Sequence, residues 1–98
     1  MKGYVVTNFT VNNPDTFKKY LSLVGETVDK YKGKFLVRGP IENVLEGTPF
    51  KFLAIVEFNS VKEAETWFYS QEYKDIIEMR LESSEGWFII TQEFSPPK

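Results

Sequence analysis

Two stretches of this 98-residue sequence follow the same plan: an alternating strand pattern, then a helical pattern, then a second strand pattern. In the first stretch the strand covers residues 3–11, the helix starts at Pro14, and the second strand starts at Lys34. In the second stretch the strand covers residues 52–58, helical spacing covers residues 61–81, and the last strand covers residues 87–94. The chain therefore reads as β-α-β-β-α-β in one domain of residues 1–98.

The two halves also resemble each other in detail. Gly-Lys-Phe-Leu-Val at residues 33–37 is similar to Gly-Trp-Phe-Ile-Ile at residues 86–90. A split βαβ repeat of this kind predicts an α+β, ferredoxin-like fold, with a four-stranded antiparallel sheet and two helices on one of its faces.

Several residues that commonly start or end helices and strands set the expected bounds of these elements. Asn13 and Pro14 suit a helix start, and Ser70 is expected to restart the second helical run. Gly33 and Gly86 are expected to end the two helical segments, Gly33 in a left-handed conformation. The second strand is expected to break at Gly39-Pro40 and to continue from residue 41 to residue 45.

Composition removes whole classes of function. The chain contains no cysteine and no histidine, which excludes disulfides, thiolate nucleophiles, imidazole bases and His-ligated metal or haem. Its charge is well mixed and sums to -2, which argues against nucleic acid and membrane partners. A strand pattern near residue 4 leaves no secretory leader, so a cytoplasmic protein without metal or prosthetic group is expected.

The distribution of apolar residues on the strands predicts the oligomeric state. The third strand has apolar residues on both faces, as does the last, with Phe88 and Ile90 on one side and Trp87 and Ile89 on the other. Two helices can cover only one face of a sheet, so the opposite face needs a second cover. A homodimer with the two open sheet faces packed together is the economical arrangement.

A family resemblance covers nearly the whole chain. Gly33 to Gly39 is similar to the G-x-[YF]-L-x-R-G signature of the domain-of-unknown-function 1330 family, and "LEG" and "EF-x-S" segments follow in order, at residues 45–47 and 57–60. Ala64, Trp67 to Tyr73 and Arg80 resemble its A-x-x-WY-x-SPEY…R segment. The resemblance implies a dimeric α/β barrel and no particular reaction. Pro40, Asn59 and Gln71 depart from the family pattern and affect local turns.

Arg38 and Glu57 form the first candidate site. Simple alternation places Arg38 on the same strand face as Leu36, and Glu57 on the same face as Leu53 and Ile55. Both charged groups are therefore expected to point into the space between the sheet and its cover. They would form either a structural ion pair or the polar floor of a site for an anionic or carbonyl ligand.

Trp67, Tyr73 and Arg80 form the second candidate site. Arg80 follows Tyr73 by seven residues, two helical turns, so the two share a helix face. They could be a core aromatic pair with a solvated arginine, or the wall of a pocket between helix and sheet.

Three functional hypotheses follow. The preferred one is a small homodimeric protein that binds a small organic ligand between sheet and helices. The second is a cofactor-independent monooxygenase or isomerase acting on a small aromatic substrate, and the third is a structural dimer without ligand. An RNA-recognition domain shares the topology, but its motifs fall on the wrong strands here and the chain is acidic.

Overall fold

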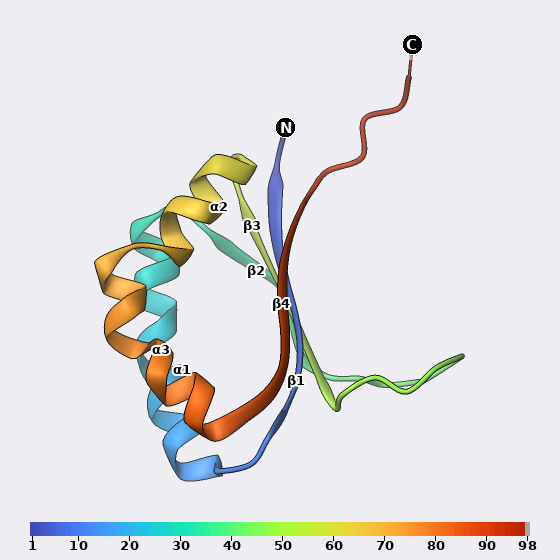
Figure 1. The fold of residues 1–98 in the computed structure, drawn as a ribbon. Coiled ribbons are helices and arrows are strands. Elements are labelled where there is room, and N and C mark those ends of the chain that lie inside the picture. The colour runs from blue at the N-terminus through green and yellow to red at the C-terminus, as the bar shows by residue number, and fades with distance from the viewer. Residues whose placement is uncertain (98) are drawn as a thin grey trace.

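The computed structural model describes residues 1–97 of the chain and contains four strands and three helices in that range (Figure 1). In chain order they are β1 (Gly3–Val11), α1 (Pro14–Lys30), β2 (Lys34–Pro40), β3 (Phe52–Phe58), α2 (Val61–Phe68), α3 (Gln71–Ser83) and β4 (Ser84–Gln92).

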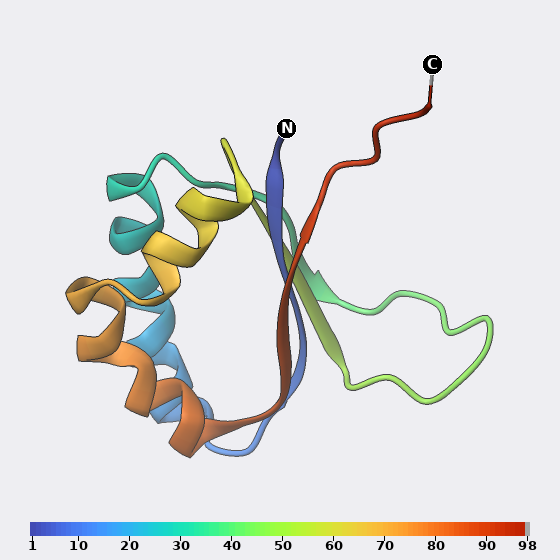
Figure 2. The ribbon, with the colours of Figure 1, turned by 45° about the horizontal axis from the view of Figure 1, so that its top comes forward.

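The strands form one antiparallel sheet in the order β2-β3-β1-β4. All three helices lie against one face of this sheet, and the other face is uncovered (Figures 1 and 2). This is the predicted ferredoxin-like α+β fold. The second helical segment is divided in two, because Ser70 caps a new helix by accepting a hydrogen bond at 3.2 Å from the backbone N–H of Tyr73.

The start of α1 follows the sequence prediction. The Asn13 side chain accepts a hydrogen bond from the backbone N–H of Thr16 at 3.2 Å, and Pro14 occupies the first turn. The apolar stripe of α1 faces the sheet, burying Phe17, Tyr20, Val24 and Val28.

The core lies between the helices and the sheet and is rich in aromatic rings. Phe58, Trp67 and Tyr73 are almost completely buried, and the ring centroids of Trp67 and Tyr73 are 4.4 Å apart. Such rings bury a large apolar area per residue, which a domain of this size needs for stability.

Two glycines have roles other than the predicted ones. The left-handed residue after α1 is Lys32, with φ 61°, so the prediction for Gly33 was wrong. Gly33 is instead packed so closely that a Cβ atom would lie 2.7 Å from the Phe58 ring. Gly86 does not end a helix either: it lies within β4 with φ 156°, where a Cβ atom would lie 2.1 Å from the Asn8 carbonyl oxygen. Both positions exclude a side chain because another part of the chain occupies the space.

The segment between β2 and β3 is a loop, so the predicted strand at residues 41–45 was wrong. Its ends are joined by a backbone hydrogen bond of 2.8 Å from Ile41 N–H to the Lys51 carbonyl oxygen. The loop projects on the uncovered side of the sheet (Figure 2). The buried Asn8 side chain anchors its end, because it accepts from the Phe50 N–H at 3.0 Å and donates to the Phe50 and Phe52 carbonyls.

β2 continues through Gly39-Pro40 and contains a bulge at Leu36, between the paired residues Phe35 and Val37. Pro40 is tolerated because β2 is an edge strand, as the missing amide hydrogen predicted. Within residues 1–97, no helix has the length and apolar character needed to cross a membrane.

Candidate functional site

A cavity of about 360 Å³ lies between the helix-facing side of the sheet and helices α1 and α3. Its sheet side is made by Val5, Thr7, Ala54 and Val56, and its helix side is mainly the apolar stripe of α1. This volume is within the range of small-molecule sites. The cavity can hold a mainly apolar molecule of one or two rings.

Two arginines border this apolar cavity. The Cζ atom of Arg38 on β2 lies 5.0 Å from the Phe35 ring centroid, and that of Arg80 on α3 lies 4.2 Å from the Phe88 ring centroid. Within residues 1–97, neither guanidinium has a carboxylate within 4.0 Å, although Glu85 also borders the cavity. Within residues 1–97 the cavity therefore has two guanidinium groups outside any ion pair, that of Arg80 half-buried and that of Arg38 exposed.

Three side chains form a polar chain beside the cavity. The Arg80 Nε–H donates to the Tyr73 hydroxyl oxygen at 2.9 Å, and the Tyr73 and Tyr20 hydroxyl oxygens are 2.7 Å apart. Burial raises the pKa of Tyr20 well above its usual value, Tyr73 adds to the rise, and Arg80 and Arg38 oppose it. Burial also raises the pKa of Tyr73, against the effect of Arg80. Both hydroxyls therefore stay protonated at neutral pH and can donate hydrogen bonds.

Trp67 of α2 also lines the cavity and is fixed in place by its indole N–H, which donates to the Thr27 hydroxyl oxygen at 2.9 Å. Since this is the only donor of the indole ring, Trp67 offers a ligand an apolar surface and no hydrogen bond.

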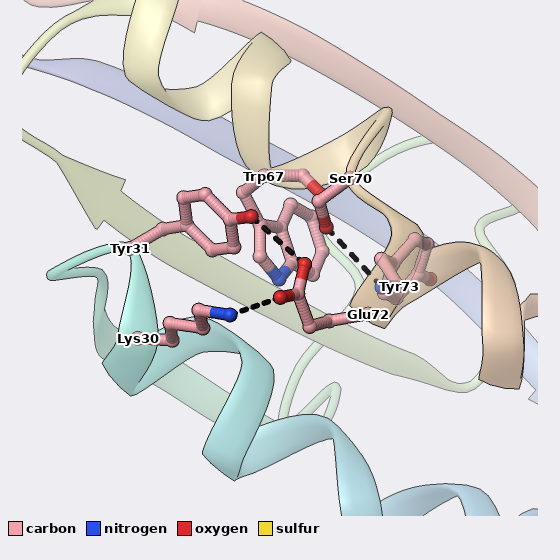
Figure 3. A network of polar contacts seen from close by, with 6 residues as sticks. All are labelled: Lys30, Tyr31, Trp67, Ser70, Glu72 and Tyr73. Carbon is pink, nitrogen blue, oxygen red and sulfur yellow. Dashed lines mark hydrogen bonds and ion pairs between the residues drawn. The ribbon is translucent and has the colours of Figure 1, made fainter.

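A second polar cluster joins the helices that carry the cavity walls (Figure 3). Glu72, in the first turn of α3, accepts a hydrogen bond at 2.8 Å from the hydroxyl of Tyr31 and forms an ion pair with Lys30 at the end of α1. The Lys30 hydrogen bond is the main reason that the pKa of Glu72 falls to about 2. Glu72 is therefore a carboxylate at neutral pH and holds the end of α1 against the start of α3.

The structure separates Arg38 from Glu57, so the prediction that they share one space was wrong. The bulge at Leu36 interrupts the alternation of β2, and Phe35 and Arg38 both take positions on the helix-facing side. Glu57 belongs to the opposite face, and its Oε1 atom lies 3.4 Å from Lys2 Nζ. Glu57 is therefore not part of the cavity.

The other predicted residues converge there. Arg38, Trp67 and Arg80 line the cavity, and Tyr73 lies directly behind it, hydrogen-bonded to Arg80. Tyr20 was not predicted as a site residue, because its helical spacing marks it only as part of an apolar stripe. Its hydroxyl contact with Tyr73, 53 residues further along the chain, depends on how α1 and α3 pack.

The uncovered face of the sheet is a second unusual surface. Val37, Trp87 and Ile89 lie on it and are 42%, 44% and 49% exposed. Apolar side chains that are grouped on one sheet face mark an interaction surface more often than isolated exposed ones do. Within residues 1–97, no group of three or more His, Cys, Asp or Glu side chains is placed to hold a metal ion.

The sequence matches the model of one protein family, the domain of unknown function 1330, over residues 2–94. A search of curated proteins finds no significant match.

Solved structures with this fold cover almost the whole chain. A protein of unknown function from Rhodopseudomonas palustris has a TM-score of 0.80 at 15% identity, over 97% of this chain and 84% of its own. A dimeric ferredoxin-like protein of unknown function from Jannaschia has a TM-score of 0.74 at 10% identity, over 97% and 100%. SnoaB, a cofactor-independent oxygenase from Streptomyces nogalater, has a TM-score of 0.69 at 10% identity, over 97% and 95%. At these identities the similarity establishes the fold.

Proposed function

The chain belongs to the family of the domain of unknown function 1330, and we propose that it binds a small organic anion in the cavity between its sheet and its helices. The observation that carries this proposal is the pair of arginines, Arg38 and Arg80, bordering one apolar cavity without a carboxylate partner within residues 1–97. A half-buried guanidinium such as that of Arg80 gains most from a bound carboxylate or similar anion, and the exposed Arg38 adds a second positive charge to the lining. The binding requires only side chains of this chain, without metal or prosthetic group.

The surroundings of the two arginines suit an aromatic anion. The guanidinium groups of Arg38 and Arg80 lie over Phe35 and Phe88, which limits their orientations and presents flat apolar surfaces beside each charge. The Tyr20 hydroxyl supplies a further polar group, and Trp67 and the α1 stripe supply the apolar walls. An aryl carboxylate or a phenolate matches this combination of charge, flatness and size.

The test is a titration of the protein with benzoate and 2-naphthoate by calorimetry and thermal shift at pH 7. We expect saturable binding, with a rise in unfolding free energy of about 2.7 kcal/mol at 100 times the dissociation constant. Arg38→Met should weaken binding about tenfold or more, which corresponds to the loss of one charge-assisted contact. Lys18→Met, which removes an exposed positive charge of α1 away from the cavity, is the matched control and should have little effect.

Two results would contradict the proposal. Wild-type protein that binds neither aryl carboxylate would remove it and would favour the structural dimer without ligand. Equal weakening by Arg38→Met and Lys18→Met would show that binding is non-specific attraction of anions to a positive surface.

We also propose that the protein works as a homodimer joined through the uncovered sheet face. The apolar side chains of that face support this arrangement, as does the description of a structural neighbour as dimeric. The cavity lies on the opposite side of the same sheet, so a dimer of this form leaves both cavities accessible from the helix side.

A cofactor-independent oxygenase is the second candidate, favoured by the similarity to SnoaB and by Arg38 and Arg80 at the cavity, which could stabilise a substrate phenolate or enolate. In one balanced form of such a reaction, a substrate CH₂ group becomes a carbonyl and the second oxygen atom of O₂ leaves as water. The electrons that reduce O₂ then all come from the substrate. Oxygen consumption with a hydroxylated aromatic substrate that contains such a CH₂ group, and with no added cofactor, would distinguish this enzyme from a binding protein.

A further inference from the structure

We propose that Tyr20 donates a hydrogen bond to the ligand's anionic oxygen, and that Arg80, acting through Tyr73, fixes the direction of this donation. The inference rests on the proposed anion-binding function and narrows it to ligands that present a carboxylate, phenolate or enolate oxygen to Tyr20. Tyr73 is then a positioning residue, and Tyr20 is the residue that contacts the ligand.

The direction follows from what each group can donate. A guanidinium has no acceptor, so the Arg80 Nε–H must donate and the Tyr73 oxygen must accept, at 2.9 Å. Tyr73 is completely buried, and within residues 1–97 its hydroxyl contacts one other oxygen, that of Tyr20, at 2.7 Å. The Tyr73 hydrogen therefore points to Tyr20, since any other orientation leaves a buried donor without an acceptor.

This arrangement leaves the Tyr20 hydrogen available. Within residues 1–97 the Tyr20 hydroxyl is hydrogen-bonded to Tyr73 alone, from which its oxygen accepts, so its own hydrogen can bond to a third group, and Tyr20 lines the cavity. A ligand must therefore offer an acceptor at this point. The positive charges of Arg38 and Arg80 make a negatively charged oxygen the favoured one, and they exclude an ammonium group.

The first experiment compares Tyr20→Phe, Tyr73→Phe and Tyr31→Phe with the wild-type protein. The Tyr31 hydroxyl donates to Glu72 away from the cavity, so Tyr31→Phe is the matched control. We expect Tyr20→Phe to weaken benzoate binding about tenfold or more, because a hydrogen bond to a charged group is lost. Tyr73→Phe should weaken it less, since Tyr20 remains but its hydrogen is no longer directed, and Tyr31→Phe should bind as the wild type does.

Matched ligands test the charge of the acceptor. Benzamide keeps a carbonyl acceptor without the charge, and benzylamine carries a cation. We expect benzoate to bind more tightly than benzamide, benzylamine not to bind, and Tyr20→Phe to reduce the preference for benzoate over benzamide. Unchanged benzoate affinity in a folded Tyr20→Phe protein would overturn the role of Tyr20 while leaving the anion site intact. Absence of benzoate binding by the wild-type protein would overturn the anion site itself.

A measurement without ligand tests the direction separately. In an equal mixture of H₂O and D₂O, a slowly exchanging tyrosine hydroxyl gives two resolved ¹³Cζ resonances, and a rapidly exchanging one gives a single resonance. We expect two resonances for Tyr73, whose hydrogen is enclosed between two oxygens, and one for Tyr20 until benzoate is added. The reverse assignment, two resonances for Tyr20 and one for Tyr73, would overturn the proposed direction whatever the ligand affinities are.

Discussion

At the scale of single residues, the raised pKa values of the buried tyrosines Tyr20 and Tyr73 make the free energy of unfolding vary with pH in the alkaline range. Burial is the main cause for both Tyr20 and Tyr73, and Arg80 opposes it in both. Their pKa values in the folded state exceed the ordinary value of 10.0, so the folded state is favoured while both hydroxyls stay protonated. This contribution to stability is complete below pH 10 and is lost as pH rises above it. We expect the unfolding free energy to fall above pH 10 less steeply in Tyr20→Phe than in the wild type. Urea unfolding at several pH values above 10 measures this fall, and Tyr69→Phe, at an exposed tyrosine, is the control. An equally steep fall of the unfolding free energy in Tyr20→Phe and the wild type would contradict the expectation.

The site residues could be predicted from the sequence only in part. Trp67, Tyr73 and Arg80 were recognised as a group because helical spacing and the family pattern both pointed to them. Arg38 was predicted from simple alternation to share a face with Leu36 and a space with Glu57, whereas the structure places it at the cavity without Glu57. One extra residue in a strand exchanges the two faces, and nothing in the local sequence marks Leu36 as the bulge.

At the scale of elements, Glu72 links the end of α1 to the start of α3 through an ion pair and a hydrogen bond. The pKa of Glu72 is lowered from 4.5 to about 2 mainly by the Lys30 hydrogen bond, so its stabilisation is present above pH 4.5 and is lost as pH falls towards 2. We expect Glu72→Gln to remove part of the acid-induced loss of stability in this range. Thermal melts from pH 7 to pH 2 measure this loss. The control is Glu26→Gln, at an exposed carboxylate of α1 that forms no ion pair within residues 1–97. A Glu72→Gln protein that loses stability with acid as steeply as the wild type would show that the ion pair has little weight in solution.

The elements themselves were largely predictable from the sequence. β1, β3 and the start of α1 have the predicted bounds, because alternation, helical spacing and the Asn13-Pro14 cap are local signals. The loop after Pro40 and the packing of Gly33 were not predictable in this way. Residues 41–45 have strand-like composition, but within residues 1–97 they pair with no strand. The space around Gly33 is filled by Phe58, 25 positions away in the sequence.

At the scale of the whole molecule, the proposed dimer makes Ile89 a sensitive position. Ile89 lies on the uncovered sheet face and is half exposed, so a lysine there would have to be desolvated when two sheets pack together. We expect Ile89→Lys to weaken dimerisation roughly 10- to 100-fold, as measured by sedimentation equilibrium. Leu23→Lys, which makes the same kind of change on the helical side, should leave the dimer intact. A wild-type protein that sediments as a monomer at micromolar concentration would contradict the dimer itself.

The bulge in β2 has a further consequence for aggregation. Fibrils grow when a sheet edge templates the strand of another chain, and a four-stranded sheet has two such edges. Here one edge, β2, is irregular at Leu36 and lacks an amide hydrogen at Pro40, while β4 pairs regularly with β1 over its whole length. Two copies joined at β4 would carry a β2 strand at each outer edge. We therefore expect strand addition by this protein to be disfavoured beyond such a pair.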